Sequence, residues 1–128
     1  MTVLDTSVLI EVVSVAADSP IPARLRRFIA NGERLAVPSL VLYEFLRGPR
    51  RAEEIAFQEA LFPIGRALVF GAFEAQLSAN LYRTVRRARG REIDLAIASC
   101  AIAHDAALWT LNVRDFADIP GLRLVAVE

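Results

Sequence analysis

Four acidic side chains stand where the sequence is expected to pass from a strand to a helix or loop. Asp5 directly follows the short apolar strand Val3–Leu4, and Glu44 lies in an otherwise apolar helix after a second strand. Asp94 opens an alanine- and isoleucine-rich helix, and Asp115 follows a later strand. Because the carboxyl ends of parallel strands share one edge of a sheet, we expect these acids to gather in one cleft.

Such a cluster of carboxylates requires compensating positive charge. Burying an isolated carboxylate is costly, and the chain contains no Lys. Hard divalent cations bind through oxygen ligands and commonly act on phosphates. The acids therefore predict a site for Mg²⁺ or Mn²⁺.

Two of the acids also have a simpler explanation. Asp is a common N-cap, so Asp5 could cap a helix that begins at Val8, with the hydroxyls of Thr6 and Ser7 as further caps. Asp94 lies in the first turn of a helix, where the helix dipole favours an anion. At this stage both explanations stand beside the metal site.

The elements that position the acids alternate between strands and helices, which indicates parallel βαβ units covered by helices on both faces. We therefore predict the α/β class, as a three-layer α/β/α sandwich with a mainly parallel sheet of four to five strands. The expected helices span residues 8–13, 23–31, 39–46, 51–62, 72–88 and 92–104. The expected strands after the first span 35–37, 66–70, 107–111 and 122–127, although the last residues of 66–70 could instead lead into the next helix.

The composition is that of a compact domain. With 128 residues, 55% of them hydrophobic, residues 1–128 are predicted to form a single domain with a core that needs no disulfide. The apolar stretch Leu35–Leu46 contains Pro38 and is too short to cross a bilayer. No signal-peptide pattern is present, so we expect a cytoplasmic protein. The lone Cys100 is interpreted as a small buried hydrophobe.

The basic residues are all Arg and are concentrated in two stretches. The formal net charge is zero, which alone predicts no nucleic-acid binding. Arg is nevertheless suited to bidentate phosphate contacts, while a solvated helix face is the simpler meaning of such clusters. The two stretches contain Arg47, Arg50 and Arg51, and then Arg83, Arg86, Arg87, Arg89 and Arg91.

Four short motifs carry a resemblance to a known family. They are Val3-Leu-Asp5-Thr-Ser7, Pro38-Ser-x4-Glu44-x3-Gly48, Asp94-Leu-Ala-Ile-Ala98 and Thr110-x-Asn112-x-x-Asp115-Phe116. In their order and spacing across nearly the whole chain, they resemble the PIN-domain ribonucleases, in particular the toxins of bacterial VapBC-type toxin–antitoxin pairs.

This resemblance implies a PIN-like fold and a Mg²⁺- or Mn²⁺-dependent endoribonuclease. It implies that Asp5 and Asp94 chiefly hold the metal, while Glu44 and Asp115 orient the attacking water or bind a second ion. It also implies an RNA substrate, an antitoxin partner that blocks the acidic cleft, and a homodimer. The supporting polar residues would be Thr6, Ser7, Thr110 and Asn112, and the expected RNA-binding residues are Arg86, Arg87, Arg89 and Arg91.

One position departs from the family pattern. An acid two residues before Asp94 is not expected, and Glu92 stands there. It is either an auxiliary metal ligand or an exposed acid of the first helical turn.

Other classes fit the sequence less well. A phosphoaspartate receiver domain needs a late Lys, which is absent, and a haloacid-dehalogenase-type phosphatase needs a second Asp where Ser7 stands. The serious alternative is a PIN-like binding module that acts through protein partners and does not cut RNA. The presence of all four acids argues against it.

Overall fold

The computed structural model describes residues 1–14 and 18–127. Within them, a parallel sheet has the strand order β2-β1-β3-β4. The strands are β1 (Thr2–Leu4), β2 (Leu35–Ala36), β3 (Ala107–Trp109) and β4 (Arg123–Leu124). The predicted α/β fold with a parallel sheet is confirmed.

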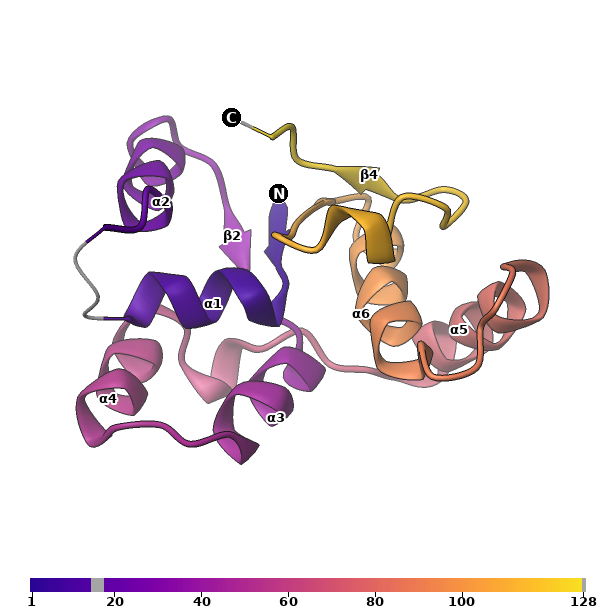
Figure 1. Ribbon diagram of the computed structural model, residues 1–128, viewed down its shortest axis with the longest axis horizontal. Helices are drawn as coiled ribbons and strands as arrows, with labels where there is room; N and C mark the ends of the chain where they lie inside the picture. The colour runs from indigo at the N-terminus through magenta and orange to yellow at the C-terminus, as the bar shows by residue number, and fades with distance from the viewer. Residues whose placement is uncertain (15–17, 128) are drawn as a thin grey trace.

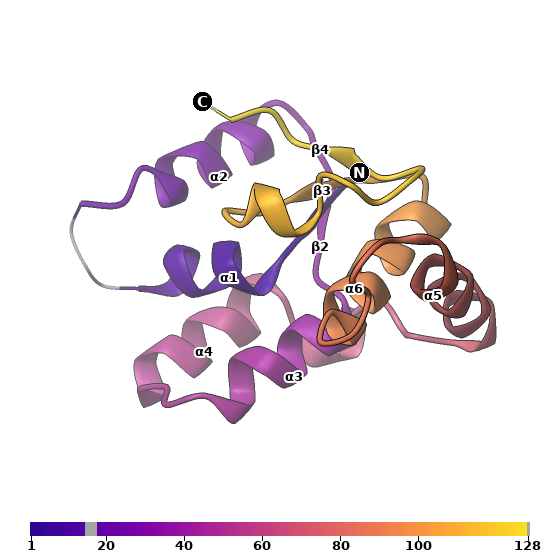
Figure 2. The same cartoon turned by 45° about the vertical axis from the view of Figure 1, so that its right-hand side comes forward.

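Helices cover the sheet on both sides. Figures 1 and 2 show α1 and α2 to one side of the strands, α5 and α6 to the other, and α3 and α4 packed below. Helix α1 also packs against α3 and α4. The helices are α1 (Thr6–Val13), α2 (Ile21–Ala30), α3 (Ser39–Arg47), α4 (Ala52–Leu61), α5 (Ala72–Thr84) and α6 (Glu92–Ala103).

The central strand β1 fixes where the first acid lies. All three residues of β1 are buried, as expected for a strand with neighbours on both sides and helices on both faces. Val3 pairs with Ala36 of β2 and with Leu108 of β3. The next residue, Asp5, donates its backbone N–H to the carbonyl of Trp109 at 2.9 Å. Asp5 and the end of β3 therefore lie at the same edge of the sheet.

The expected strand over 66–70 is wrong. The 3-10 turn η1 (Ile64–Arg66) occupies its start, and only Leu68 makes a parallel bridge, to Pro38. Leu68 donates to the Val37 carbonyl at 3.0 Å and accepts from the Ser39 N–H at 2.8 Å. Helix α3 begins at Ser39, so the pairing has no further strand residues to follow.

Several expected boundaries also shift. Helix α1 begins at Thr6 rather than Val8, and the last strand is limited to β4. Helix α5 ends at Thr84, four residues before the expected end at position 88. The backbone leaves the helical conformation at Val85, with a φ of -75° and a ψ of 150°, and then turns through Arg87 and Gly90, whose φ values are 54° and 87°.

A buried apolar cluster joins the layers. It includes Leu4 of β1, Phe45 of α3, Ile97 of α6 and Trp109 of β3. Cys100 is buried in α6, and burial raises the pKa of its thiol to about 11, which agrees with the predicted inert role. No helix of the described residues is both long and apolar enough to span a membrane.

Candidate active site

The carboxylate of Asp5 is held by two hydroxyl groups from different parts of the chain. Ser7 donates to its Oδ2 at 3.1 Å, and Thr110 donates to the same oxygen at 2.7 Å. Asp5 occupies the N-cap position of α1, but its side chain makes no capping hydrogen bond within this fully described helix. The structure therefore does not support the capping explanation. Asp5 is only 4% exposed, so its carboxylate is buried at the carboxyl edge of the sheet.

Glu44 joins Asp5 through the first turn of α1. Its Oε1 accepts a 2.7 Å hydrogen bond from the hydroxyl of Thr6. Its Oε2 lies 3.6 Å from a guanidinium nitrogen of Arg47, one turn further along α3. Thr6 and Ser7 are thus the first-turn residues that tie the acids to α1, and they do not cap it as the sequence suggested.

The negative charges of the other three acids act on Asp94. Burial first, and then the negative charges of Asp5, Asp115 and Glu44, raise the pKa of its carboxyl group to about 6, while the Arg91 guanidinium acts in the opposite direction. Such a shift requires the carboxylates to lie near one another. Asp5, Asp115 and Glu44 therefore lie within the range of charge interaction with Asp94.

Asp115 stands at the end of the 3-10 turn η2 (Val113–Asp115), directly after β3. Its N–H donates to the Asn112 carbonyl at 3.0 Å, and the Asn112 N–H donates to the Thr110 hydroxyl at 3.0 Å. The following residue, Phe116, is 1% exposed and anchors the turn in the core. Thr110 therefore connects the Asp115 turn to Asp5, and Asn112 contributes through its backbone.

The acids suit a divalent cation by their chemistry. Among residues 1–14 and 18–127, no three Asp, Glu, His or Cys side chains converge closely enough to hold an ion as they stand. Coordination needs oxygens about 2.0 to 2.6 Å from one point, whereas charge acts over longer distances. The exposed side chain of Asp115 and the half-buried side chain of Glu44 can rotate towards a cation near Asp94 without repacking the core.

The arginines expected to bind RNA divide into two groups. Arg86, Arg87 and Arg89 are exposed in the turn that leads into α6. Arg91 differs, because its guanidinium bonds within the protein, to Asp118, to the Asp115 carbonyl and to the Arg86 carbonyl. Asp118 was not among the residues predicted from the sequence. A sequence signal for this pair exists: Asp118 lies three residues after Asp115, and Arg91 lies three residues before Asp94.

Glu92 lies on another side of α6. It is exposed and lines a shallow cavity together with Ser78, Tyr82 and Arg83, towards α5. Glu92 is not among the charges that shift the pKa of Asp94. The position agrees with an exposed first-turn acid rather than an auxiliary ligand.

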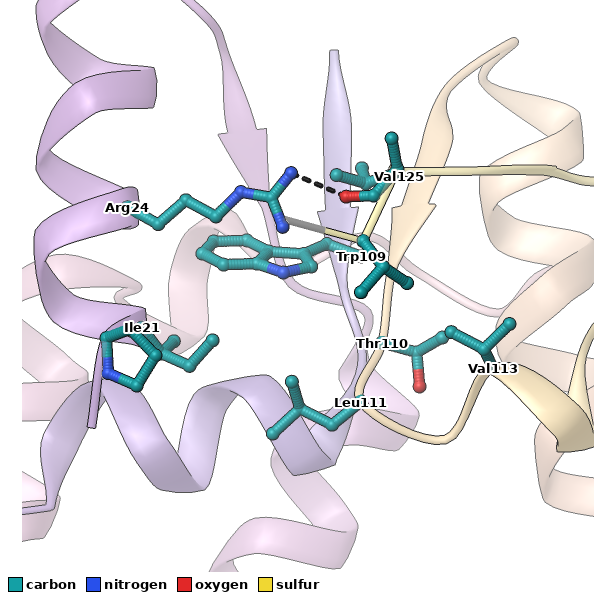
Figure 3. A pocket seen from close by; sticks show the side chains of 10 residues that line it. Ile21, Arg24, Trp109, Thr110, Leu111, Val113 and Val125 are labelled. Carbon is teal, nitrogen blue, oxygen red and sulfur yellow. Dashed lines mark hydrogen bonds between the residues drawn. The ribbon is translucent and has the colours of Figure 1, made fainter. Parts of the chain in front are cut away.

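A separate cavity of about 350 Å³ is lined in part by Thr110, Trp109 and Arg24 (Figure 3). Figure 3 shows the Arg24 side chain extended over the indole of Trp109, 5.6 Å from the ring centroid, and this guanidinium donates to the Ala126 carbonyl. Thr110 lines the cavity, but none of the four acids does. The cavity therefore adjoins the acidic site without being part of it.

A parallel sheet flanked by helices, with carboxylates gathered at its carboxyl edge, defines an α/β protein whose site is suited to oxygen-bound divalent cations. The chain belongs to the PIN domain family, whose model matches residues 2–122. It is 32% identical to the ribonuclease VapC19 of Mycobacterium tuberculosis, over 96% of this chain and 98% of that protein.

Solved structures agree in fold. The toxin–antitoxin complex VapBC2 from Rickettsia felis, bound to a DNA fragment from its promoter, contains a chain with a TM-score of 0.72 and 22% identity, covering 99% of this chain and 98% of that one. DNA-bound VapBC from Salmonella typhimurium contains a chain with a TM-score of 0.69 and 25% identity, covering 97% of this chain and 96% of that one.

Proposed function

We propose that this chain, acting as a single PIN-like unit over residues 1–128, is a Mg²⁺- or Mn²⁺-dependent endoribonuclease and the toxin of a type II toxin–antitoxin pair. The observation that carries the proposal is the pKa of Asp94, which burial and the charges of Asp5, Asp115 and Glu44 raise to about 6. Carboxylates that repel one another at a sheet edge favour a bound cation, and the kinship with ribonuclease VapC19 supports RNA as the substrate.

The four acids have different roles, which follow from their burial and hydrogen bonds. Asp5 and Asp94 are the main ligands, because Asp5 is fixed by the Ser7 and Thr110 hydroxyls and Asp94 stands on the first turn of α6. Glu44 is half-buried and Asp115 is exposed, and these two orient the attacking water or complete a second site. When bound, the cation lowers the pKa of water and offsets charge on the phosphate. Water attacks phosphorus and the P–O3′ bond breaks, so the products are a 3′-hydroxyl and a 5′-phosphate, whereas attack by the ribose 2′-hydroxyl would leave a 2′,3′-cyclic phosphate.

The RNA backbone is held near the first turn of α6. Arg86, Arg87 and Arg89 are exposed in the turn that precedes it, and Asp94 lies in that first turn. Arg suits phosphate contacts because its planar group can bind two oxygens at once. A substrate that lies over Asp94 would therefore pass this turn. We propose that the protein acts on RNA in the cytoplasm.

Protein partners are supported by an apolar surface on α3 and α4. Tyr43 and Leu46 of α3 are 55% and 38% exposed, and Ile55 and Phe57 of α4 are 40% and 48% exposed. Of the ten described residues of α4, Gln58 alone is buried. We propose that the chain forms a homodimer and binds an antitoxin, and that this surface takes part in one of these contacts.

The deciding experiment measures cleavage of a fluorescent RNA by purified protein in Mg²⁺, in Mn²⁺ and in EDTA. We expect cleavage with either metal, none in EDTA, and products that a 5′-phosphate-dependent exonuclease degrades. An intact RNA under all conditions, together with a folded protein that binds its antitoxin, would leave a PIN-like binding module as the function.

A further inference from the structure

Arg91 connects the segment that carries Asp94 to the segment that carries Asp115. It is the N-cap residue of α6, three residues before Asp94. One terminal nitrogen donates to the Asp115 carbonyl at 2.8 Å and to Asp118 Oδ1 at 2.6 Å. The other donates to Asp118 Oδ2 at 3.0 Å and to the Arg86 carbonyl at 3.1 Å.

These contacts make Arg91 a rigid connection. The pairing with the Asp118 carboxylate is bidentate, which fixes the plane of the guanidinium. The Arg91 side chain is only 19% exposed, although its partner Asp118 is 49% exposed. A guanidinium whose two terminal nitrogens are bound in this way is poorly placed to bind a phosphate as well.

Arg91 links the first turn of α6 to the Asp115 turn, two segments whose acids repel each other. On the sheet side, the Asp115 turn is anchored by Phe116 in the core and, through Asn112, by the hydroxyl of Thr110. On the α6 side, the side-chain hydrogen bonds described for the turn are those with Arg91. Asp94 and Asp115 repel each other, so a link between their two segments opposes their separation.

We propose that Arg91 is a positioning residue, which holds the Asp115 turn at the distance from Asp94 that a shared divalent cation requires. The proposal rests on the proposed metal-dependent nuclease function. Groups that orient metal ligands typically contribute about 10- to 100-fold to metal affinity.

The direction of one effect separates this role from a purely electrostatic one. Arg91 is a cation beside the acids, so if it acted only through charge, Arg91→Gln would tighten Mg²⁺ binding. If Arg91 positions the turn, the same variant binds Mg²⁺ more weakly. Arg91→Lys keeps the charge but cannot bridge the Asp118 carboxylate and the Asp115 carbonyl with a planar fork, so it should not restore affinity.

The test is calorimetric titration of Mn²⁺ into wild-type and variant proteins without RNA, with Mn²⁺-dependent melting temperatures as a second readout. We expect the Kd for Mn²⁺ to rise about tenfold in both Arg91→Gln and Arg91→Lys. Asp118→Asn, a change at a half-exposed side chain, should give a smaller rise in the same direction, and it keeps the proposal testable if Arg91→Gln does not fold.

A matched control exists at the other end of α6. Arg123 donates to the carboxylate of Asp105 at 2.9 Å and to the Asp105 carbonyl at 2.8 Å, so it makes the same kind of contact with an Asp and a carbonyl. Arg123→Gln should leave the Kd for Mn²⁺ unchanged. An unchanged or lower Kd in folded Arg91→Gln overturns the positioning role.

The outcomes also separate this proposal from the proposed function. If the wild-type protein binds no Mn²⁺ and cleaves no RNA, the metal-dependent nuclease itself is refuted. If the wild-type protein binds Mn²⁺ and cleaves RNA while Arg91→Gln binds Mn²⁺ equally well, only the positioning role fails. A rise in the KM for RNA at unchanged Mn²⁺ affinity would instead assign Arg91 to phosphate binding.

Discussion

The hydroxyl of Thr110 donates a 2.7 Å hydrogen bond to the carboxylate of Asp5, across 105 positions of sequence. The two residues follow neighbouring strands, since Leu4 pairs with Trp109. The same hydroxyl accepts the N–H of Asn112, which begins the turn to Asp115. One buried side chain thus orients one acid and anchors the segment that carries another.

Thr110→Val tests this connection. Valine has nearly the same shape but removes one of the two hydroxyl donors to the Asp5 carboxylate and the hydroxyl that accepts from the Asn112 N–H. We expect a loss of about 1 to 2 kcal/mol in the free energy of unfolding and a fall in kcat of about tenfold. Urea unfolding and single-turnover cleavage measure the two effects. Thr110→Ser keeps the hydroxyl, so it should retain most of the activity, and equal losses in both variants would count against the hydrogen bond.

Asp5→Asn tests the metal ligand. We expect cleavage to fall by more than about 100-fold, because a ligating charge is lost while the hydroxyls of Ser7 and Thr110 can still donate to the amide oxygen. In EDTA the variant should be as stable as the wild type or more stable, by roughly 1 kcal/mol, because the charge of Asp5 disfavours ionised Asp94.

Melting temperatures in EDTA and in excess Mg²⁺ check this prediction. Mg²⁺ should raise the melting temperature of the wild type much more than that of Asp5→Asn. Asp105→Asn is the control, since Asp105 is exposed at the far end of α6 and should respond like the wild type. Equal Mg²⁺ responses of wild type and Asp5→Asn, with cleavage intact, would remove Asp5 from the metal site.

The pH dependence of metal-free stability tests Asp94. Its pKa is raised from 3.8 to about 6 in the folded protein by burial, then by Asp5, Asp115 and Glu44, against the opposing charge of Arg91. Between these pH values the folded state binds more protons than the unfolded state, so stability falls as pH rises from about 4 to above 6.

Asp94→Asn should remove most of this contribution. A shift of this size corresponds to about 3 kcal/mol, which solvent screening at a half-buried group reduces to on the order of 1 kcal/mol. Urea unfolding in EDTA at a series of pH values measures it. A stability that changes with pH equally in wild type and variant would mean that Asp94 is not the group responsible.

The exposed arginine turn should carry part of the RNA affinity. We expect Arg86→Gln combined with Arg89→Gln to weaken RNA binding and to lower the salt slope of the binding constant by up to about 1.4, at roughly 0.7 per phosphate of single-stranded RNA. The measurement is RNA binding by fluorescence anisotropy in Ca²⁺ at several salt concentrations. The control removes Arg26 and Arg34, which are exposed on α2 and before β2. If both pairs have the same effect, the turn contributes only general charge.

The apolar surface on α3 and α4 should bind a protein. Ile55→Ser combined with Phe57→Ser exposes less apolar area and removes no buried side chain, so we expect stability to change by less than about 1 kcal/mol. The double variant should lose either the homodimer or the antitoxin complex, as measured by light scattering after size-exclusion chromatography with and without antitoxin. If both assemblies persist unchanged at micromolar concentration, this surface is not the interface.

Much of this site was predictable from local sequence. Asp5 could be placed at the end of a strand because a short apolar run precedes it and hydroxyl residues follow. Asp94 could be placed on the first turn of a helix because alanines and isoleucines continue from it. Strands that alternate with helices imply a parallel sheet, and a parallel sheet places its carboxyl ends at one edge. The sequence alone therefore predicts that the four acids lie at one edge of the sheet.

Only the tertiary structure decided how these acids are held. The partners of Asp5, Glu44 and Arg91 are Thr110, Thr6 and Asp118, at sequence separations of 105, 38 and 27. No local pattern encodes such pairs, because each depends on the register of strands and the packing of helices. The same reason explains why Leu68 makes one bridge in place of a strand, and why α5 stops at Thr84. Apolar periodicity specifies which elements form, whereas hydrogen-bond partners and element ends depend on what the folded chain brings within reach.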